Sequence, residues 1–343
     1  MPCRVHLVGS IGLDTVQEVF ATTGKLLGSH LKRFPDGEPG GRRMWINWQY
    51  PLLRGSPFLQ LDHSRPPAIT GCMQLMLADG VKAEDVHFGE LGYAREARAS
   101  YQDFLAAREN GQLPRDARFQ VCLPTPFAVV AAQVSPAHIP AIEASYEKAM
   151  IREAEAVIAA IPHKDLCIQW DICIEMVAFD GRTPYLPSFP HMDKFFGERF
   201  GRLTQVIPYT VELGFHLCYG DLDAKHAIEP IDATKLVEMT HLIIASVKHP
   251  IAYFHMPVPI NRTDDAYFAP LTNLKLPPET ELFLGLIHAK DGVIGAKQRM
   301  KAAQKYVHNF GIASECGISR ARTAETVNEI LRVHAAVAET ASA

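Results

Sequence analysis

The sequence predicts an α/β protein with a (β/α)8 TIM-barrel fold that carries a long loop or helical insertion after its first strand. Two patterns predict this fold: short apolar or β-branched runs recur along the chain, and amphipathic helical stretches separate most of them. The chain has 343 residues, which is long for one domain but common for a single barrel. We therefore expect one barrel domain spanning residues 1–343.

The candidate strands are apolar runs of strand length that end at glycine, proline or polar residues. They lie at 5–12, 86–91, 119–125, 166–172, 214–220, 251–257, 282–288 and 309–317. Clear helical patterns lie between them at 143–161, 232–247 and 295–309. The segment 13–85, between the first two strands, is rich in Pro, Gly and aromatic residues, which predicts a functional lid or binding loop.

Charge and composition exclude several classes of protein. The net charge is −4, and "GRRMW" is the densest basic cluster, so we expect no nucleic-acid partner. No apolar run approaches the roughly 20 residues that cross a bilayer, and the start lacks the pattern of a secretory signal. The cysteine count is odd, at 7, which favours a reducing compartment. We expect a cytoplasmic protein that does not associate with membranes.

A possible metal site begins at "FHLCYG". Strand side chains alternate, so His216 and Cys218 point to one face, at the C-terminal strand end where barrel active sites lie. Imidazole and thiolate are zinc ligands, and a catalytic zinc needs about three protein donors. Cys316 in "SECG" is the best third donor, and His255 in "YFHMP" is a further one. We interpret four other cysteines as small buried apolar residues: Cys72, Cys122, Cys167 and Cys173.

Together, "HLCYGD" and "ASECGISR" resemble the zinc-binding signature of the catalytic barrel of cobalamin-independent methionine synthase. That family shares its fold group with uroporphyrinogen decarboxylase. His216, Cys218 and Cys316 match the zinc positions directly. The resemblance implies one Zn²⁺ per chain and a methyltransferase that acts on a thiol.

Further short motifs resemble the same family in the same order along the chain. "LVGSIGLDT" is similar to its first strand, which implies that Ser10 helps hold an amino-acid substrate. "DGEPGG" and "QWDICIE" are similar to two substrate-binding motifs, which implies that Glu38 binds the substrate amino group, that Asp171 contacts the same substrate, and that both serve catalysis. From the residues alone, Glu90, Trp45 and Tyr93 are candidate walls of the pocket.

The sequence departs from the family pattern in ways that shape the expected function. The family's zinc glutamate is absent, so His255 replaces it or that position is empty, and "D-E-P" reads Asp171-Ile172-Cys173. One barrel is too short for the two-barrel synthase, so we expect a methyl donor other than polyglutamylated folate. The expected partners are a small thiol such as homocysteine, a methyl donor such as a corrinoid protein, and a second copy of the chain in a homodimer. Two alternatives stay open: a demethylase or lyase (decarboxylase) on a methoxylated or carboxylated small molecule, and a metal-binding barrel without turnover.

Overall fold

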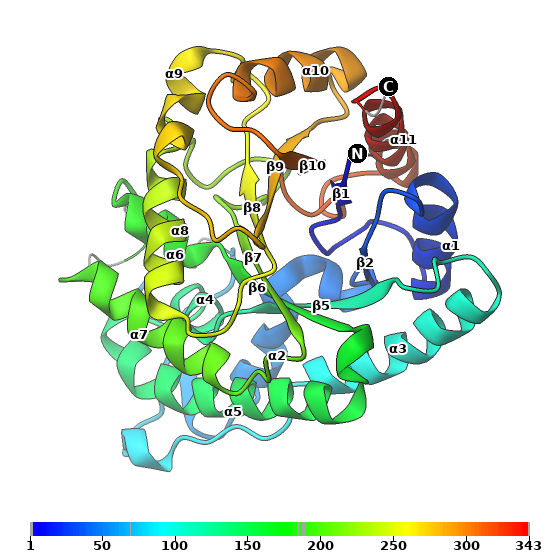
Figure 1. Ribbon diagram of the computed structural model, residues 1–343. Helices are drawn as coiled ribbons and strands as arrows, with labels where there is room; N and C mark the ends of the chain where they lie inside the picture. Colours follow the sequence, from blue (N-terminus) through cyan, green and yellow to red (C-terminus); the bar gives the residue numbers. More distant parts are fainter. Residues whose placement is uncertain (1–2, 69, 184–185, 187–189, 342–343) are drawn as a thin grey trace.

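The computed structural model describes residues 3–68, 70–183, 186 and 190–341. Its central feature is a parallel 8-stranded sheet with the order β1-β10-β9-β8-β7-β6-β5-β2. The strands are β1 (Val5–His6), β2 (Arg33–Pro35), β5 (Arg118–Pro124), β6 (Leu166–Ile172), β7 (Glu212–Leu217), β8 (Tyr253–Pro257), β9 (Glu281–Ile287) and β10 (Phe310–Ser314). Helices surround this sheet (Figure 1).

The two ends of the strand order also meet, which closes the sheet into a barrel. The amide of Val5 donates to the His30 carbonyl at 3.0 Å, just before β2. Past β1 and β2, the amide of Ile11 donates to the Gly37 carbonyl at 2.8 Å. The predicted TIM-barrel fold is therefore confirmed.

The longer helices cover the outside of the barrel, and the shorter elements lie in the connections. The longer helices are α1 (Val16–Leu27), α3 (Tyr93–Glu109), α5 (Ile139–Ala160), α7 (Met192–Gln205), α8 (Thr234–Ser246), α10 (Gly292–Ala303) and α11 (Ala324–Ala341). The short helices are α2 (Tyr50–Arg54), α4 (Pro126–Ala131), α6 (Ile174–Asp180) and α9 (Asp265–Phe268). The 3₁₀ helices are η1 (Gly40–Gln49), η2 (Ala83–Asp85), η3 (Pro136–His138), η4 (His163–Asp165) and η5 (Ala269–Asn273), and an antiparallel hairpin joins β3 (Leu59–Leu61) to β4 (Leu75–Leu77).

The second barrel strand is β2, so the prediction of a strand at 86–91 is wrong, and the long insertion follows the second strand rather than the first. Residues Val86 and Phe88 are buried between exposed neighbours, which imitates the alternation of a strand. Side chains of α5 satisfy their carbonyls instead: Ser145 donates to Val86 at 2.6 Å and Arg152 donates to Phe88 at 2.5 Å. With only 3 residues, β2 is too short to show a period of its own.

The insertion, residues 36–92, is fixed to the barrel through α4 and α5. The side chain of Gln133 donates to the Ile46 carbonyl at 2.8 Å, and the Tyr146 hydroxyl donates to Gln49 Oε1 at 2.9 Å. Both donors are buried. These contacts hold η1 close to the carboxyl ends of the strands, where it contributes Trp45 to the cavity described below.

The barrel interior contains a polar column that starts at its base. Arg33 is buried and ion-pairs with Glu212 at 2.6 Å and Glu281 at 2.9 Å. Its guanidinium lies 4.6 Å from the centre of the Tyr253 ring. The Tyr253 hydroxyl in turn donates to Gln169 Oε1 at 2.9 Å, halfway to the mouth. Most polar atoms of this column have a partner, Arg33 Nη2 being an exception among the described residues, and these bonds fix the side chains above it.

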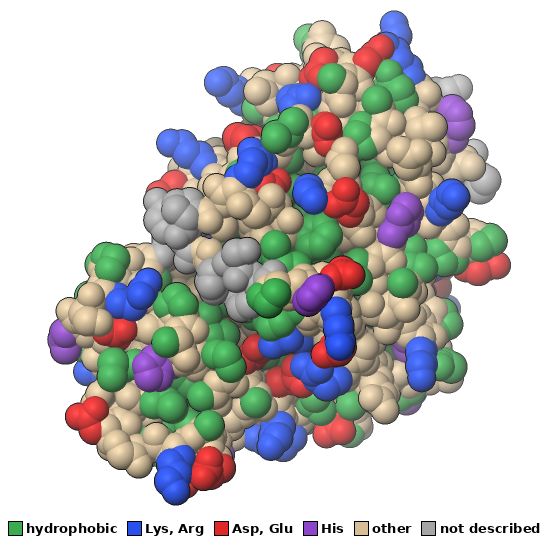
Figure 2. Space-filling model, turned by 90° about the vertical axis from the view of Figure 1, so that its left-hand side faces the viewer, with side chains coloured by type: hydrophobic (Ala, Val, Ile, Leu, Met, Phe, Trp, Pro, Cys, Tyr) green, Lys and Arg blue, Asp and Glu red, His purple; other side chains and the backbone are tan. Residues whose placement is uncertain are grey.

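On the face of the molecule shown in Figure 2, acidic and basic side chains are mixed among the described residues, without a broad area of one sign. None of the described helices is both long and apolar enough to span a membrane.

Candidate functional site

The strand alternation of β7 brings His216 and Cys218 to the inside of the barrel mouth. Both side chains are buried, with exposed fractions of 3% and 2%. Gly220 adopts a φ of 94°, which turns the chain after the strand, and its amide donates to Cys218 Sγ at 3.1 Å. This turn holds the thiol at the end of the strand.

Cys316, just past β10, completes a group of three donors. Its Sγ lies 3.3 Å from Cys218 Sγ and 3.7 Å from His216 Nε2, and all three donor atoms lie within 4.8 Å of one another. Ligand atoms around a tetrahedral zinc, with bonds of about 2.0–2.3 Å, stand about 3.5–3.8 Å apart. The buried donor set therefore fits a zinc ion in both chemistry and spacing.

His255 lies behind His216 and does not point toward the thiols, so the structure does not bring this predicted ligand into the group. Its Nε2 lies 3.0 Å from the Ser314 carbonyl, which only accepts, so Nε2 carries the proton. Burial lowers the pKa of His255 to about 3, so its Nδ1 is an acceptor. That atom lies 2.7 Å from His216 Nδ1, which must donate. The lone pair of His216 is thereby fixed on Nε2, the atom that faces Cys316.

Asp171, at the end of β6, lies beside His216 in the strand register. Gln169 donates to its Oδ1 at 2.9 Å and Trp45 Nε1 donates to its Oδ2 at 3.3 Å. Burial nevertheless raises the pKa of Asp171 to about 7. Trp45 adopts a φ of 52° and a ψ of −113°, a sparsely populated conformation that costs a non-glycine residue about 1–3 kcal/mol. This backbone conformation occurs inside η1, the segment that brings the Trp45 indole to the Asp171 carboxylate.

Glu38 follows β2 and faces the same cavity as Asp171. No hydrogen bond to its carboxylate is found among the described residues, because the neighbouring Arg42 donates to Asp36 instead, at 2.7 Å. Burial raises the pKa of Glu38 to about 8, and the charges of Asp171 and Asp36 add to the effect.

The other predicted site residues divide between the cavity and the surface. Ser10 lines the cavity and contacts Gly317, where a Cβ would meet Ser10 Oγ at 2.1 Å. Tyr93 is buried at the start of α3 and lines a small cavity next to Glu38. Glu90 lies on the surface near Arg95, at 3.6 Å, and is not brought to the site.

Two residues of the site were not predicted from the sequence. Arg320 lines the cavity, and its side chain has no hydrogen bond or ion pair among those found for the described part of the chain. Cys173 is buried, as expected, but it also lines the same cavity and packs with Cys218, Cys316 and Trp45. The signal for Cys173 was its position two residues after Asp171, directly past the end of β6.

The cavity is small, but others adjoin it. It has a volume of about 30 Å3. An apolar cavity of about 70 Å3 shares Trp45 and Cys173 with it. A wider cavity of about 640 Å3 also reaches Cys316 and is lined by His226, His288 and Glu315. Ion pairs of His226 with Glu315 at 3.0 Å and with Glu229 at 3.1 Å outweigh its burial and raise the pKa of His226 to about 9.

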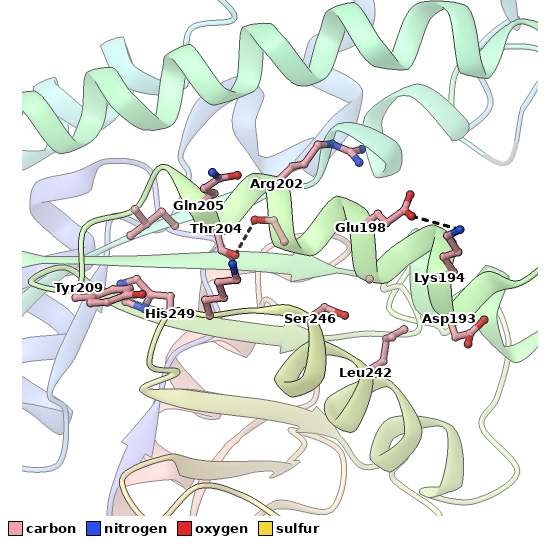
Figure 3. Close-up of a pocket in the computed structure, with 14 residues that line it drawn as sticks. Asp193, Lys194, Glu198, Arg202, Thr204, Gln205, Tyr209, Leu242, Ser246 and His249 are labelled. Atoms are coloured by element: carbon pink, nitrogen blue, oxygen red, sulfur yellow. Dashed lines mark hydrogen bonds and ion pairs between the residues drawn. The ribbon is translucent and has the colours of Figure 1, made fainter.

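A cavity of about 720 Å3 lies elsewhere, in the groove between α7 and α8 (Figure 3). Tyr209 and His249, which line its one end, precede β7 and β8, so this end lies at the N-terminal face of the barrel. Lys194 and Glu198 form a surface ion pair at 3.9 Å along it. Barrel chemistry takes place at the opposite face, so we place the functional site at the thiols.

Comparisons with known proteins find similarity in structure rather than in sequence. No protein-family model and no curated protein matches the chain. A protein from Listeria monocytogenes assigned as a vitamin-B12-independent methionine synthase superposes with a TM-score of 0.61 at 13% identity, covering 99% of this chain and 98% of that one. A B12-independent methionine synthase from Shewanella sp. W3-18-1, in complex with selenomethionine, gives 0.60 at 13% identity over 99% and 98%. A methyltransferase from Methanosarcina mazei gives 0.50 at 13% identity over 96% and 93%. At this identity the likeness shows the fold alone.

Proposed function

We propose that this protein is a zinc-dependent methyltransferase that methylates a small thiol, with homocysteine as the model acceptor. The observation that carries the proposal is the convergence of His216, Cys218 and Cys316 at the C-terminal mouth of the barrel. The fold shared with methionine synthases and a methyltransferase supports it.

The proposed chemistry is nucleophilic transfer of a methyl group. When bound at these donors, zinc would supply the Lewis acidity that holds an acceptor thiol as its thiolate near neutral pH. The acceptor sulfur forms a bond to the methyl carbon as the bond between donor and methyl breaks. The donor keeps that bonding electron pair, and the proton of the thiol passes to solvent. The protein's own task is to hold both reactants in line.

The residues around the three donors suit an acceptor that is an α-amino acid. Glu38 and Asp171 present two carboxylates to one cavity, and burial raises the pKa of both, to about 8 and about 7. An ammonium group placed between them would restore the ionised form of both. Arg320, whose guanidinium has no partner found in the described residues, is placed to receive a carboxylate. Ser10 lines the same cavity as these three residues.

The cavities offer space for the methyl donor on the other side of Cys316. About 640 Å3 accommodates a small methylated compound. A corrinoid carried by a partner protein would instead approach the open mouth. Either methyl donor, the small methylated compound or the corrinoid, would take the place of the polyglutamylated folate that a two-barrel synthase uses.

A second candidate is a demethylase or lyase that acts on a methoxylated small molecule. The apolar cavity beside Cys173 favours it, because Met44, Trp45 and Ile174 offer a surface for an aromatic ring. Thiol dependence separates the two candidates, since only the methyltransferase needs a sulfur acceptor.

The test measures zinc and turnover on the same preparations. We expect about one zinc per chain in the untagged protein, lost in Cys218→Ser and Cys316→Ser but kept in Cys72→Ser. We also expect methionine, detected by mass spectrometry, when homocysteine is supplied with methylcobalamin or a methylsulfonium compound. Zinc without turnover on any donor would favour a metal-binding barrel. Absence of zinc would contradict the proposal. Cytoplasmic location, which reduced thiols require, and a homodimer stay predictions.

A further inference from the structure

The two thiol donors follow strands that do not pair with each other. Cys218 follows β7 and Cys316 follows β10, and β8 and β9 lie between these strands in the sheet. The ladder of β9 with β10 also shifts its register between Ile312 and Ser314, shortly before Cys316. Backbone pairing therefore connects the two thiols only through three strand pairs, one of them irregular. A direct contact between the loops that follow β7 and β10 would fix the separation of the thiols more closely.

A buried ion pair provides such a contact. Asp221 follows Cys218 in the loop after β7, and Arg322 follows Cys316 in the loop after β10. The guanidinium of Arg322 donates to both carboxylate oxygens of Asp221, at 2.7 Å and 3.0 Å. The side chains of Arg322 and Asp221 are 18% and 8% exposed. Because both groups are planar, a bidentate pair fixes their mutual orientation as well as their distance.

Short hydrogen bonds within each loop connect this ion pair to the thiols. In the loop after β7, the amide of Gly220, the residue before Asp221, donates to Cys218 Sγ at 3.1 Å. In the loop after β10, Arg322 also donates to the Arg320 carbonyl at 2.9 Å. A displacement of either ion-pair partner would therefore move the loop that carries its thiol.

A second ion pair joins the same two loops. His226, in the loop after β7, lies 3.0 Å from the carboxylate of Glu315, which directly precedes Cys316. The side chain of His226 is 5% exposed, and that of Glu315 is 23% exposed. Two contacts thus bridge the mouth of the barrel at the place where the thiols meet.

We propose that the Asp221–Arg322 ion pair is a positioning element of the zinc site, which holds Cys218 and Cys316 at the separation that zinc requires. The inference rests on the proposed function in one respect, that zinc is the resident metal. Neither residue belongs to the group of three donors, so the fourth position of the metal stays available to the acceptor sulfur. Without the ion pair, zinc binding would have to order the two loops itself, which lowers the affinity.

Zinc affinity, measured by competition with a chelator dye on the reduced full chain, tests the proposal. We expect Arg322→Met and Asp221→Asn each to weaken zinc binding roughly tenfold, while one zinc still binds. The double variant should bind zinc no more weakly than either single variant, because the two side chains act as one unit. Arg322→Lys keeps one charged hydrogen bond, so its zinc affinity should lie between those of Arg322→Met and the wild type.

Arg199→Met is the matched control. The Arg199 side chain is also 18% exposed, and it donates to both carboxylate oxygens of Glu143, at 2.6 Å and 2.7 Å. This ion pair joins α7 to α5 on the outside of the barrel and bridges no loop that carries a zinc donor. Its loss should leave the zinc affinity unchanged.

Cobalt absorption distinguishes positioning from ligation. The thiolate-to-cobalt absorption per bound Co²⁺ should be the same in the wild type and in the Arg322 and Asp221 variants, because the same thiols remain donors. Circular dichroism of each variant shows that it is folded. Zinc affinity that is unchanged in Arg322→Met, or lowered equally in Arg199→Met, would overturn the inference and leave the proposed function standing. A wild-type protein that binds no zinc would overturn the proposed function and the inference with it.

Discussion

Replacing Glu38 by glutamine removes a carboxylate that the fold encloses without a hydrogen-bond partner among the described residues. Glutamine keeps the shape of the side chain and the backbone amide that donates to Asp36. The substitution therefore isolates the cost of the charge. We expect Glu38→Gln to stabilise the ligand-free protein at alkaline pH and to have little effect near pH 5.

The magnitude follows from the raised pKa of Glu38, about 8 against an ordinary value of 4.5. Between these values the folded protein holds a proton that the unfolded chain has released, so the free energy of unfolding falls as the pH rises. At 1.36 kcal/mol per unit, the interval from pH 5 to pH 8 amounts to about 4 kcal/mol. Because Glu38 is half-buried, we discount this for solvent to about 2 kcal/mol.

Urea unfolding of the reduced, metal-free protein at pH 5 and pH 9 measures this difference. The stability of Glu38→Gln relative to wild type should rise by about 2 kcal/mol between the two pH values. Glu90→Gln is the matched control, since Glu90 is 56% exposed in its side chain, and should show no such change. A relative stability that does not depend on pH, or falls with it, would refute the reasoning that Glu38 is desolvated in the folded protein.

Three further substitutions test other parts of the structure. His255→Leu should weaken zinc binding about 10- to 100-fold, measured by competition with a chelator dye, while one zinc still binds, because the imidazole ligand loses its orienting acceptor. Gly317→Ala should lower the free energy of unfolding by about 1–3 kcal/mol, because its Cβ would meet a serine hydroxyl at 2.1 Å, whereas Gly41→Ala, with no atom within 4 Å, should be neutral. Arg299→Met should cost about 3–5 kcal/mol in urea unfolding, since Arg299 is fully buried in an ion pair, and Arg332→Met, 62% exposed, should cost less than about 0.5 kcal/mol.

The local sequence pattern was sufficient to predict much of the barrel and part of the site. The run at 166–172 coincides with β6, and the run at 214–220 overlaps β7, because each is long, apolar and bounded by a turn. Period-two alternation also predicted that His216 and Cys218 share a face, which the structure shows. The same alternation predicted a strand at 86–91 that does not exist, because side chains of α5 rather than a neighbouring strand bind the backbone there.

What the sequence by itself determined is the set of donors that each strand end presents: two from β7 and one after β10. Only the tertiary structure decided which of these donors meet, because the closing of the barrel brings Cys316 within 3.3 Å of Cys218 across 98 positions of sequence. It also turned His255 away from the thiols and placed Cys173 among them. Spacing along a chain fixes the face of one strand, whereas the distance between two strand ends depends on the register of every strand pair between them.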